Sequence, residues 1–354
     1  MNVSESSLDV LAAELASRRS FLKVIECVVF GILLLTTVIG NLLTLLTVYR
    51  NKRLRTIPNF FVISLAISDL GMGLTCMPLS FSVLVKSSWL YGDVMCQFEG
   101  YVAIILAAAS TQTLAAMAVN RYFGIVKCLL YRSYFTTKRT IGLILVIWIS
   151  SVVPPFIYLV AGDIFIFHPG KLFCYLELSA GWFTAFLVGV YVGIPSAAII
   201  FCYTKVFQTI NARNKRYKKD SNGDTVSVEE IKITRTLFVI VVFYMICWTP
   251  VLIVDLVDLF FGRYASPREI YLAYTFLVSV SSAVNPVIYG VMNQSFRKEF
   301  LSILQILNCF KPRGNGKAAQ SSSGVQKQTK EIELSETSTK SKSPHILRRA
   351  KIKT

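Results

Sequence analysis

Charged residues are scarce in this chain. Asp, Glu, Lys and Arg make up 16% of its 354 residues, whereas 54% are hydrophobic and the mean hydropathy is +0.56. A soluble domain carries about 25% charged residues, so much of this chain must contact a solvent other than water. Histidine is rarer still, because His168 and His345 are the only two and both lie outside the long apolar runs. Asp69, inside the second run, has no obvious carboxylate mate, and no histidine lies within the runs, which argues against an enzyme acting inside a membrane.

The excess of positive charge does not indicate a nucleic-acid partner. The formal net charge is +17, but the basic residues fall in short loops between apolar runs rather than over one soluble surface. A cleavable signal peptide is not evident either, because residues 1–23 are polar and mixed in charge. The charge pattern is typical of a membrane protein, with the first apolar run acting as a signal anchor.

Seven apolar runs are long enough to cross about 30 Å of hydrocarbon as helices. They cover residues 27–49, 59–85, 97–126, 141–160, 182–207, 236–260 and 270–291. Several contain proline, which membrane helices tolerate because neighbouring helices satisfy the freed carbonyls. The sequence therefore predicts an all-α integral membrane protein, a bundle of seven transmembrane helices followed by a short amphipathic cytoplasmic helix.

Loop charge predicts the orientation of the bundle. The loops after the first, third and fifth runs are rich in Lys and Arg, as is the C-terminal tail, whereas the alternate loops are mixed or acidic. We therefore expect an extracellular N-terminus (residues 1–24), a seven-span domain (25–293), an amphipathic cytoplasmic helix (294–310) and a disordered cytoplasmic tail (311–354). Asn2, in the sequence Asn2-Val3-Ser4, is then a glycosylation acceptor on the outer side.

Asp69 lies in the middle of the second run, where an ionisable side chain costs a few kcal/mol and by default marks a site. Polar residues lie at comparable depth in other runs: Asn41, Ser110, Ser281, Ser282 and Asn285. Together they predict an oxygen-lined pocket for a small hard cation, and sodium is the ion that we expect. The alternative is a polar contact that satisfies Asp69 without any ion. No other cofactor is expected.

Three of the eight cysteines have predicted roles outside the helix interiors. Cys96 at the outer end of the third run and Cys174 in the following outer loop face an oxidising compartment, which predicts a disulfide between them. Cys309 follows the amphipathic stretch on the inner side and is a candidate for palmitoylation, with an unmodified thiol as the alternative.

Motifs from every run, in the same order and at the same depth, resemble the rhodopsin-like class of G-protein-coupled receptors over residues 25–310. They are Gly40-Asn41, Leu65-Ala66-Ile67-Ser68-Asp69, Asn120-Arg121-Tyr122, Trp148, Pro195 with Tyr203, Cys247-Trp248-Thr249-Pro250 and Asn285-Pro286-Val287-Ile288-Tyr289. Within the class the chain is similar to melatonin receptors, in residues 40–52, in Asn120 before Arg121 and in residues 289–300.

The chain also departs from the melatonin-receptor pattern. The differing positions are Thr249, Pro286, Tyr158, Leu176 and Leu178. The last three stand where those receptors carry an asparagine, a phenylalanine and a glutamine that contact the ligand. A melatonin-type ligand would lose these anchors, so the resemblance does not predict the ligand.

The resemblance implies a conformational switch at the cytoplasmic end. Arg121 would pair with Glu230 in the resting state, and breaking this pair would let span six swing outwards and admit a G-protein helix. Asn120 replaces the aspartate that most relatives carry, so Arg121 is held less firmly and some basal activity is expected. Tyr203 and Tyr289 would bridge through water in the active state. The alternative for Arg121 is an interfacial side chain that reaches the headgroups.

Trp248, next to the kink at Pro250, is expected to act as a toggle below the ligand cavity, the alternative being a bulky core residue. Ala103 stands where amine receptors carry an aspartate, and Ser279 stands at the retinal-bearing lysine position. The residues expected to line the cavity are Ala103, Tyr158, Tyr191, Asp255 and Tyr274, with Gln112 deeper down. Asp255 and Asp258 are expected either to meet a cationic ligand or to form salt bridges with Arg263 and Arg268 at the rim.

The expected partners follow from this topology. An extracellular small molecule or peptide would be the ligand, and residues 211–230 and 296–307 would contact a heterotrimeric G protein and anionic lipid at the plasma membrane. Hydroxyl-rich stretches at 321–323 and 335–343 are candidate phosphorylation sites for arrestin binding. The alternatives are a receptor-shaped protein that no longer signals and a seven-helix transporter or channel, although no internal repeat favours a transporter.

Overall fold

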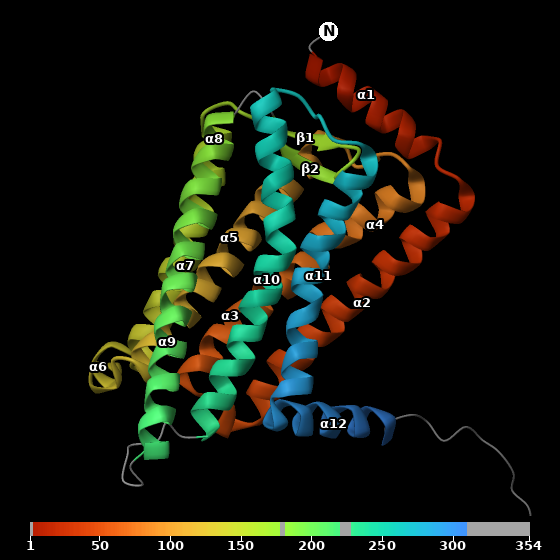
Figure 1. The fold of residues 1–354 in the computed structure, drawn as a ribbon. Helices are drawn as coiled ribbons and strands as arrows, with labels where there is room; N and C mark the ends of the chain where they lie inside the picture. The colour runs from red at the N-terminus through yellow and green to blue at the C-terminus, as the bar shows by residue number, and fades with distance from the viewer. Residues whose placement is uncertain (1–2, 178–180, 220–227, 310–354) are drawn as a thin grey trace, which may run out of the picture. The chain divides into compact units, whose positions relative to one another are not determined.

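The computed structural model describes residues 3–177, 181–219 and 228–309, and within these segments the side chains of residues 3–5, 214–219, 228–230 and 306–309 lie outside the description. Seven helical stretches are long and apolar enough to cross a membrane, which confirms the predicted spans and the helical fold (Figure 1). They are α2 (Ser20–Arg50), α3 (Ile57–Leu74) with α4 (Cys76–Lys86), α5 (Gly92–Ile125), α7 (Thr137–Val160), α8 (Gly181–Phe186) with the π-helix η3 (Leu187–Gly193) and α9 (Ile194–Lys219), α10 (Val228–Phe261) and α11 (Arg268–Met292).

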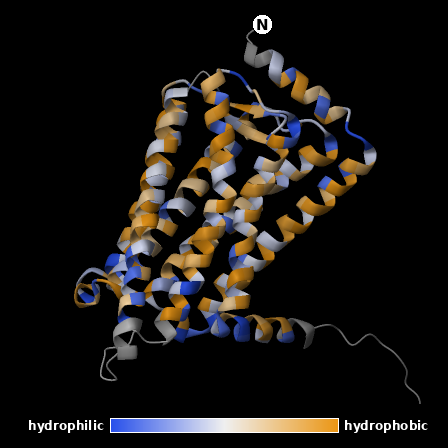
Figure 2. Cartoon of the chain, in the orientation of Figure 1, coloured by the Kyte–Doolittle hydropathy of each residue, from blue (hydrophilic) through white to orange (hydrophobic). Residues whose placement is uncertain are grey.

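The outside of the bundle is apolar, and Figure 2 shows hydrophobic residues along the spans. On α2, for example, Ile32, Leu35 and Ile39 are 58%, 60% and 53% exposed. Exposing such surface to water costs about 25 cal/mol per Å², whereas hydrocarbon tails accept it without penalty. The exposed faces of the spans therefore fit a bilayer.

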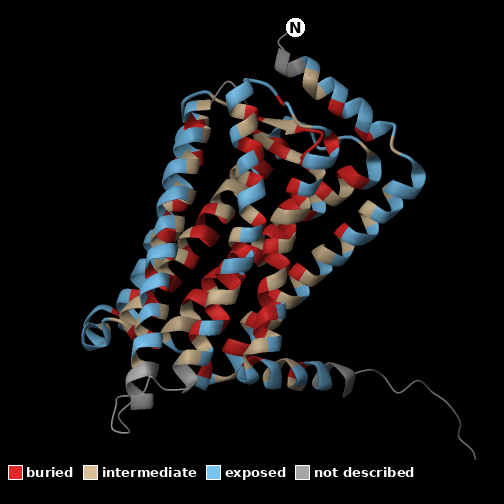
Figure 3. Cartoon of the chain, in the orientation of Figure 1, coloured by how far each residue is buried: buried red, intermediate tan, exposed pale blue. Residues whose placement is uncertain are grey.

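The central helix of the bundle is α5, which packs against α3, α7, α9 and α10. Its buried residues run from Cys96 to Ile125 and include the small residues Ala108, Ala109 and Ser110. Small side chains let membrane helices approach closely. In Figure 3 the buried residues accordingly lie along the inward faces of the helices.

Prolines explain two irregular spans. α3 and α4 form one span that breaks at Thr75, because Pro78 has no N–H to donate to the carbonyl of Leu74. Pro195 likewise leaves the carbonyl of Tyr191 without its helical donor. The π-helix η3 precedes this proline, and at its end the N–H of Ile194 donates to the carbonyl of Gly189.

A β-hairpin that the sequence analysis did not predict covers the predicted outer end of the bundle. Strands β1 (Phe165–His168) and β2 (Phe173–Leu176) pair antiparallel, with Phe165 opposite Leu176. The predicted Cys96–Cys174 disulfide is present and ties β2 to α5, with 5.3 Å between the Cα atoms. Gly100 provides the space for this contact, because a Cβ atom there would lie 2.4 Å from Cγ of Phe165.

Three short α-helices and a 3-10 turn complete the fold of the described residues. α1 (Val3–Ala16) occupies the stretch expected to be an N-terminal tail, with Leu11 and Leu15 buried, and α2 begins before the predicted boundary at residue 25. α6 (Cys128–Tyr134) lies in the loop after α5, and a 3-10 turn, η1 (Lys52–Leu54), follows α2. α12 (Gln294–Cys309) corresponds to the predicted amphipathic helix and packs against α11 and α2 (Figure 1).

Candidate functional site

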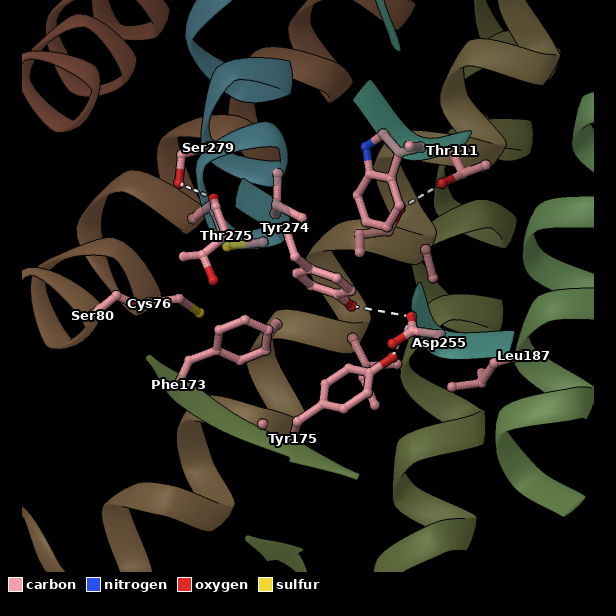
Figure 4. Close-up of a pocket in the computed structure, with 18 of the residues that line it drawn as sticks. Cys76, Ser80, Thr111, Phe173, Tyr175, Leu187, Asp255, Tyr274, Thr275 and Ser279 are labelled. Atoms are coloured by element: carbon pink, nitrogen blue, oxygen red, sulfur yellow. Dashed lines mark hydrogen bonds between the residues drawn. The ribbon is translucent and has the colours of Figure 1, made fainter. Parts of the chain in front are cut away.

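A cavity lies among α3, α4, α5, η3, α10 and α11, beneath strand β2. Its volume is about 130 Å³. Ala103, Tyr191, Asp255 and Tyr274 line it, as the sequence analysis expected. Most of the remaining lining is apolar: Phe30, Met72, Met77, Ile104, Ala107, Ala108, Phe173, Leu187, Val188, Val192, Leu252 and Val278. Figure 4 shows the rings of Phe173, Tyr175 and Tyr274 turned towards this space.

Gln112 does not line the cavity, because its amide donates to Ser151 at 3.0 Å and accepts from Ser150 at 2.9 Å. Tyr158 is likewise not among the residues that line the cavity, contrary to the expectation. Its ring is fully buried and stacks 4.7 Å from the ring of Phe183, with Phe165 of the hairpin 5.1 Å away. Its hydroxyl donates to the carbonyl of Ile164 at 2.9 Å and accepts from the N–H of Glu177. Because the hairpin covers the outer end of α7, Tyr158 supports the hairpin and does not reach a ligand.

Asp255 is the polar centre of the cavity roof. One carboxylate oxygen accepts from Nζ of Lys171 at 2.7 Å, and the other accepts from the hydroxyls of Tyr175 at 2.9 Å and Tyr274 at 3.1 Å. Lys171, in the turn between β1 and β2, is only 1% exposed. The roof is therefore a buried ion pair that joins the hairpin to α10, with two tyrosines hydrogen-bonded to the same carboxylate (Figure 4).

The alternative of salt bridges from Asp255 and Asp258 to Arg263 and Arg268 is wrong. Asp258 accepts from the hydroxyl of Tyr271 at 2.5 Å and from the N–H of Ala265 at 3.1 Å. Arg268 pairs instead with Glu26 on α2, at 2.8 Å. Arg18, between α1 and α2, also contacts that glutamate. The carboxylate that pairs with Arg268 is therefore Glu26 and not one of the two aspartates.

The turn that carries Lys171 is anchored through its backbone. The N–H of Lys171 donates to Nδ1 of His168 at 3.1 Å, and its carbonyl accepts from the hydroxyl of Thr275 at 2.5 Å. Burial, reinforced by the Lys171 charge, lowers the pKa of His168 well below its ordinary value, so the ring is neutral and acts as an acceptor. Burial and the nearby Asp255 charge raise the pKa of Tyr175, which keeps its hydroxyl protonated and donating.

The floor of the cavity is shared with a second, smaller pocket. Trp248 lines both, stacks on Tyr244 with ring centroids 5.4 Å apart, and donates from its indole to Ser281 at 3.3 Å. The hydroxyl of Tyr244 is hydrogen-bonded to Thr111 of α5. The expected toggle residue therefore touches both the outer cavity and the polar pocket below it.

The smaller pocket brings together the residues predicted to hold a cation. Asp69, Ser110, Ser281, Ser282 and Asn285 all line it. Asp69 accepts from the side-chain amide of Asn285 at 2.8 Å, and Ser110 donates to Ser68 at 2.8 Å. Carboxylate, hydroxyl and amide oxygens are the ligands that a hard cation prefers.

Asn41 was expected in this oxygen-lined pocket but lies outside it. Its amide donates to the backbone carbonyls of Thr37 at 2.9 Å and Ser282 at 3.1 Å. It therefore holds α2 against α11, and its amide is committed to backbone groups.

At the opposite end of the spans, Arg121 is only 5% exposed and donates to Oδ1 of Asn120 from Nε at 3.2 Å and from a terminal nitrogen at 2.5 Å. The amide of Asn120 donates to the hydroxyl of Tyr131 on α6. The hydroxyls of Tyr203 and Tyr289 are buried without a hydrogen-bond partner among the described residues. The structure does not describe the side chain of Glu230, the expected partner of Arg121. The side chains of Asn2 and Cys309 also lie outside the description.

Two site residues escaped the sequence analysis. Lys171 is the only lysine or arginine between the fourth and fifth spans, close to Cys174, and this isolation is the signal that could have identified it. Glu99 lies inside the predicted third span, where an ionisable residue should always be examined. In the structure it is fully buried, and its carboxylate accepts from the N–H of Cys174 at 3.0 Å, which fixes β2 on α5.

The sequence of this chain is similar to those of known proteins. The sequence profile of the 7 transmembrane receptor (rhodopsin family) matches residues 40–289. The chain belongs to the rhodopsin family of seven-transmembrane receptors. It is 29% identical to melatonin receptor type 1A of Phodopus sungorus over 82% of this chain and 81% of that receptor. Melatonin receptor type 1B-B of Danio rerio is 27% identical, over 78% of this chain and 81% of that receptor.

Membership of this family defines the general activity. A rhodopsin-family receptor is a multi-pass plasma-membrane protein that takes an extracellular ligand and couples to a G protein, so the chain is a receptor rather than an enzyme. The alternative of a transporter or channel is not favoured.

Proposed function

We propose that this receptor transmits ligand binding to the G protein through Trp248 and Arg121. The supporting observation is that Trp248 lines both the outer cavity and the Asp69 pocket. A ligand that shifts the indole must therefore change the packing of α10 against α5, where Tyr244 is bonded to Thr111. A ligand acts by preferring one of two such arrangements, and in the second one Arg121 leaves Asn120 and α10 moves outwards.

Sodium is proposed as an allosteric ligand of the resting state. Asp69 would supply the charge, and Ser110, Ser281 and Asn285 would supply neutral oxygens from two other spans. An ion at this position joins α3, α5 and α11, so it would oppose a rearrangement that separates them. Trp248 lies in the wall of the same pocket, which links the ion to the ligand cavity.

The receptor is proposed to have its N-terminus outside and its C-terminus in the cytoplasm, as loop charge requires. α12 supports this orientation, because Phe296 and Ile303 are buried whereas Leu301 and Leu304 are 55% and 44% exposed next to Arg297 and Lys298. Such a helix suits an anionic bilayer surface. Phosphorylation of the hydroxyl-rich tail, in residues 311–354, would then recruit arrestin.

The proposal can be tested in cells without knowing the ligand. Dissociation of each G-protein family would be recorded for the wild type, Arg121→Ala and Glu230→Ala, at matched surface expression. We expect a basal signal in the wild type, a larger one with Glu230→Ala and none with Arg121→Ala. A wild-type signal that Arg121→Ala leaves intact would refute the role of Arg121.

A further inference from the structure

Lys171 is held in a cage of one carboxylate and two close aromatic rings, with the ring of Tyr271 further away, 5.8 Å from the ammonium group. Its ammonium group lies 2.7 Å from a carboxylate oxygen of Asp255, 3.9 Å from the ring centroid of Tyr175 and 4.6 Å from that of Tyr274. A cation within about 6 Å of an aromatic face is attracted by the ring, and cages of this kind recognise organic ammonium ligands. The cage is buried, since Asp255 is 6% and Tyr274 4% exposed.

The cage is organised without help from the lysine side chain. Tyr175 and Tyr274 both donate to the second oxygen of Asp255, so the carboxylate that binds the cation also fixes the two rings. The turn is likewise independent of the lysine stem, because His168 and Thr275 bond the backbone of Lys171. The ammonium group could leave while the turn and the rings keep their positions.

The cage opens on the ligand cavity. Tyr175, Asp255 and Tyr274 line the cavity, and Figure 4 shows their polar ends converging there. Lys171 reaches them from the opposite side, where it lines a small hollow with Asp258 and Glu177. An ammonium group on a ligand in the cavity and the ammonium group of Lys171 would therefore approach the same carboxylate from two sides.

We propose that Asp255, Tyr175 and Tyr274 form a binding site for an organic ammonium ion, that Lys171 fills this site in the present state, and that a ligand carrying an alkylammonium group competes with Lys171 for it. The ligand part rests on the proposed receptor function, whereas the ammonium site does not. The apolar walls of the cavity suit a ligand whose remaining part is apolar. Displacing Lys171 would break the ion pair between the hairpin and α10, the helix that carries Trp248.

The test removes the lysine side chain by mutation and supplies an organic ammonium ion in solution. Lys171→Ala deletes the atoms from Cγ to Nζ, which correspond to n-propylammonium. The full-length variant would be purified in detergent, and its melting temperature measured against n-propylammonium chloride, with 1-propanol and sodium chloride as controls. Removing one partner of a buried ion pair should lower Tm by about 5 °C or more. Propylammonium should restore part of the loss in a saturable manner, and neither control should.

Matched variants separate the site from general salt effects. Lys171→Ala/Asp255→Asn should not respond to propylammonium, because the carboxylate charge is gone. Lys86→Ala removes an exposed lysine at the same end of the bundle and should show the small response of the wild type. The wild type should respond only at concentrations at least about tenfold higher than Lys171→Ala, because Lys171 must first be displaced.

Each other outcome overturns part of the proposal. Equal rescue by 1-propanol, or rescue that persists in the double variant, refutes the ammonium site. A wild type that never responds refutes competition with Lys171. If Lys171→Ala unfolds during purification, its recovery in propylammonium, propanol and sodium chloride becomes the measurement, and recovery that is no better in propylammonium refutes the site. Because Tm does not depend on G-protein coupling, these results are independent of whether the proposed signalling is correct.

Discussion

Arg121 and its sequence neighbour Asn120 form a two-point contact, in which Nε and a terminal guanidinium nitrogen both donate to the amide oxygen Oδ1. Both residues are buried, at 5% and 0% exposure. A neutral amide thus occupies the position from which an aspartate would bind the same guanidinium. The guanidinium is always ionised, so both bonds are charge-assisted already, but the neutral amide lacks the opposite charge by which an aspartate would attract Arg121 further.

Restoring the charge should therefore suppress basal signalling. Asn120→Asp adds an opposite charge to both hydrogen bonds, and a gain of about 1 kcal/mol would reduce the active population roughly fivefold. Asn120→Ala removes both bonds and should raise the basal signal. The measurement is ligand-free G-protein dissociation at equal surface expression. Basal activity that changes in the same direction in both variants would show that this contact does not restrain Arg121.

Acid should destabilise the outer hairpin through His168. Burial keeps the folded pKa of His168 well below its ordinary value, whereas the unfolded residue titrates near about 6.5. As pH falls through about 6.5 the unfolded chain binds more protons than the folded one, so the free energy of unfolding falls by up to about 1.4 kcal/mol per pH unit. Groups facing the ring are Lys171, Tyr264 and Tyr271.

The variant His168→Asn retains an acceptor for the N–H of Lys171 but cannot titrate in this range. Its Tm should therefore fall less than that of the wild type between pH 7.5 and 5.5. His345→Asn changes the only other histidine and is the control. Parallel profiles for the wild type and His168→Asn would mean that the hairpin histidine does not carry the pH dependence.

Sodium should stabilise the receptor through Asp69. We expect Tm to be higher in sodium chloride than in potassium chloride at equal ionic strength, by a few degrees for each ~1 kcal/mol of binding free energy. Asp69→Asn should abolish the difference. Glu99→Gln neutralises a buried carboxylate that is not among the residues lining the pocket and should leave the difference in place. A sodium effect that survives in Asp69→Asn would place the ion elsewhere.

The contact between α5 and the hairpin should not tolerate a side chain at Gly100. Cγ, Cδ1 and Cβ of Phe165 would lie 2.4, 2.5 and 2.9 Å from an alanine Cβ, so Gly100→Ala must displace the strand and should cost about 1–3 kcal/mol. Gly142→Ala is the matched control, because no atom lies within 4 Å of a Cβ there. Thermal unfolding of both purified variants checks the difference, and equal Tm values would show that the hairpin can move aside freely.

The spans and the buried polar residues could be predicted from the sequence because a bilayer imposes simple rules. A long apolar run must cross the bilayer as a helix, and an ionisable group within such a run must have a partner. Asp69, Ser110, Ser281 and Asn285 line one pocket as predicted, since each had a defined depth in its span. The Cys96–Cys174 disulfide could be predicted for the same reason, because topology assigns both residues to the oxidising side.

The roof of the cavity could not be predicted, because loop geometry depends on contacts between distant segments. The sequence suggested the nearest arginines as partners of Asp255. The partner is instead Lys171 of the hairpin, which lies 84 positions away in the sequence. The same hairpin covers Tyr158, whose place in the fourth span had suggested a cavity residue. The short run Ile164-Phe165-Ile166-Phe167 before Pro169-Gly170 is a strand and turn signal that was not used in the prediction, whereas α1 has no apolar run that would identify it.

The central claim is that this chain activates G proteins through Arg121, and nucleotide exchange by purified components tests it most directly. Full-length receptor would be reconstituted in lipid nanodiscs with purified heterotrimers of each family, and GTP-analogue binding measured without ligand. Arg121→Ala is compared with Arg53→Ala, which removes an exposed arginine from the turn after α2. The account predicts that the wild type and Arg53→Ala accelerate exchange on at least one heterotrimer and that Arg121→Ala does not. Acceleration that is equal in all three proteins, or absent in the wild type for every family, would contradict it.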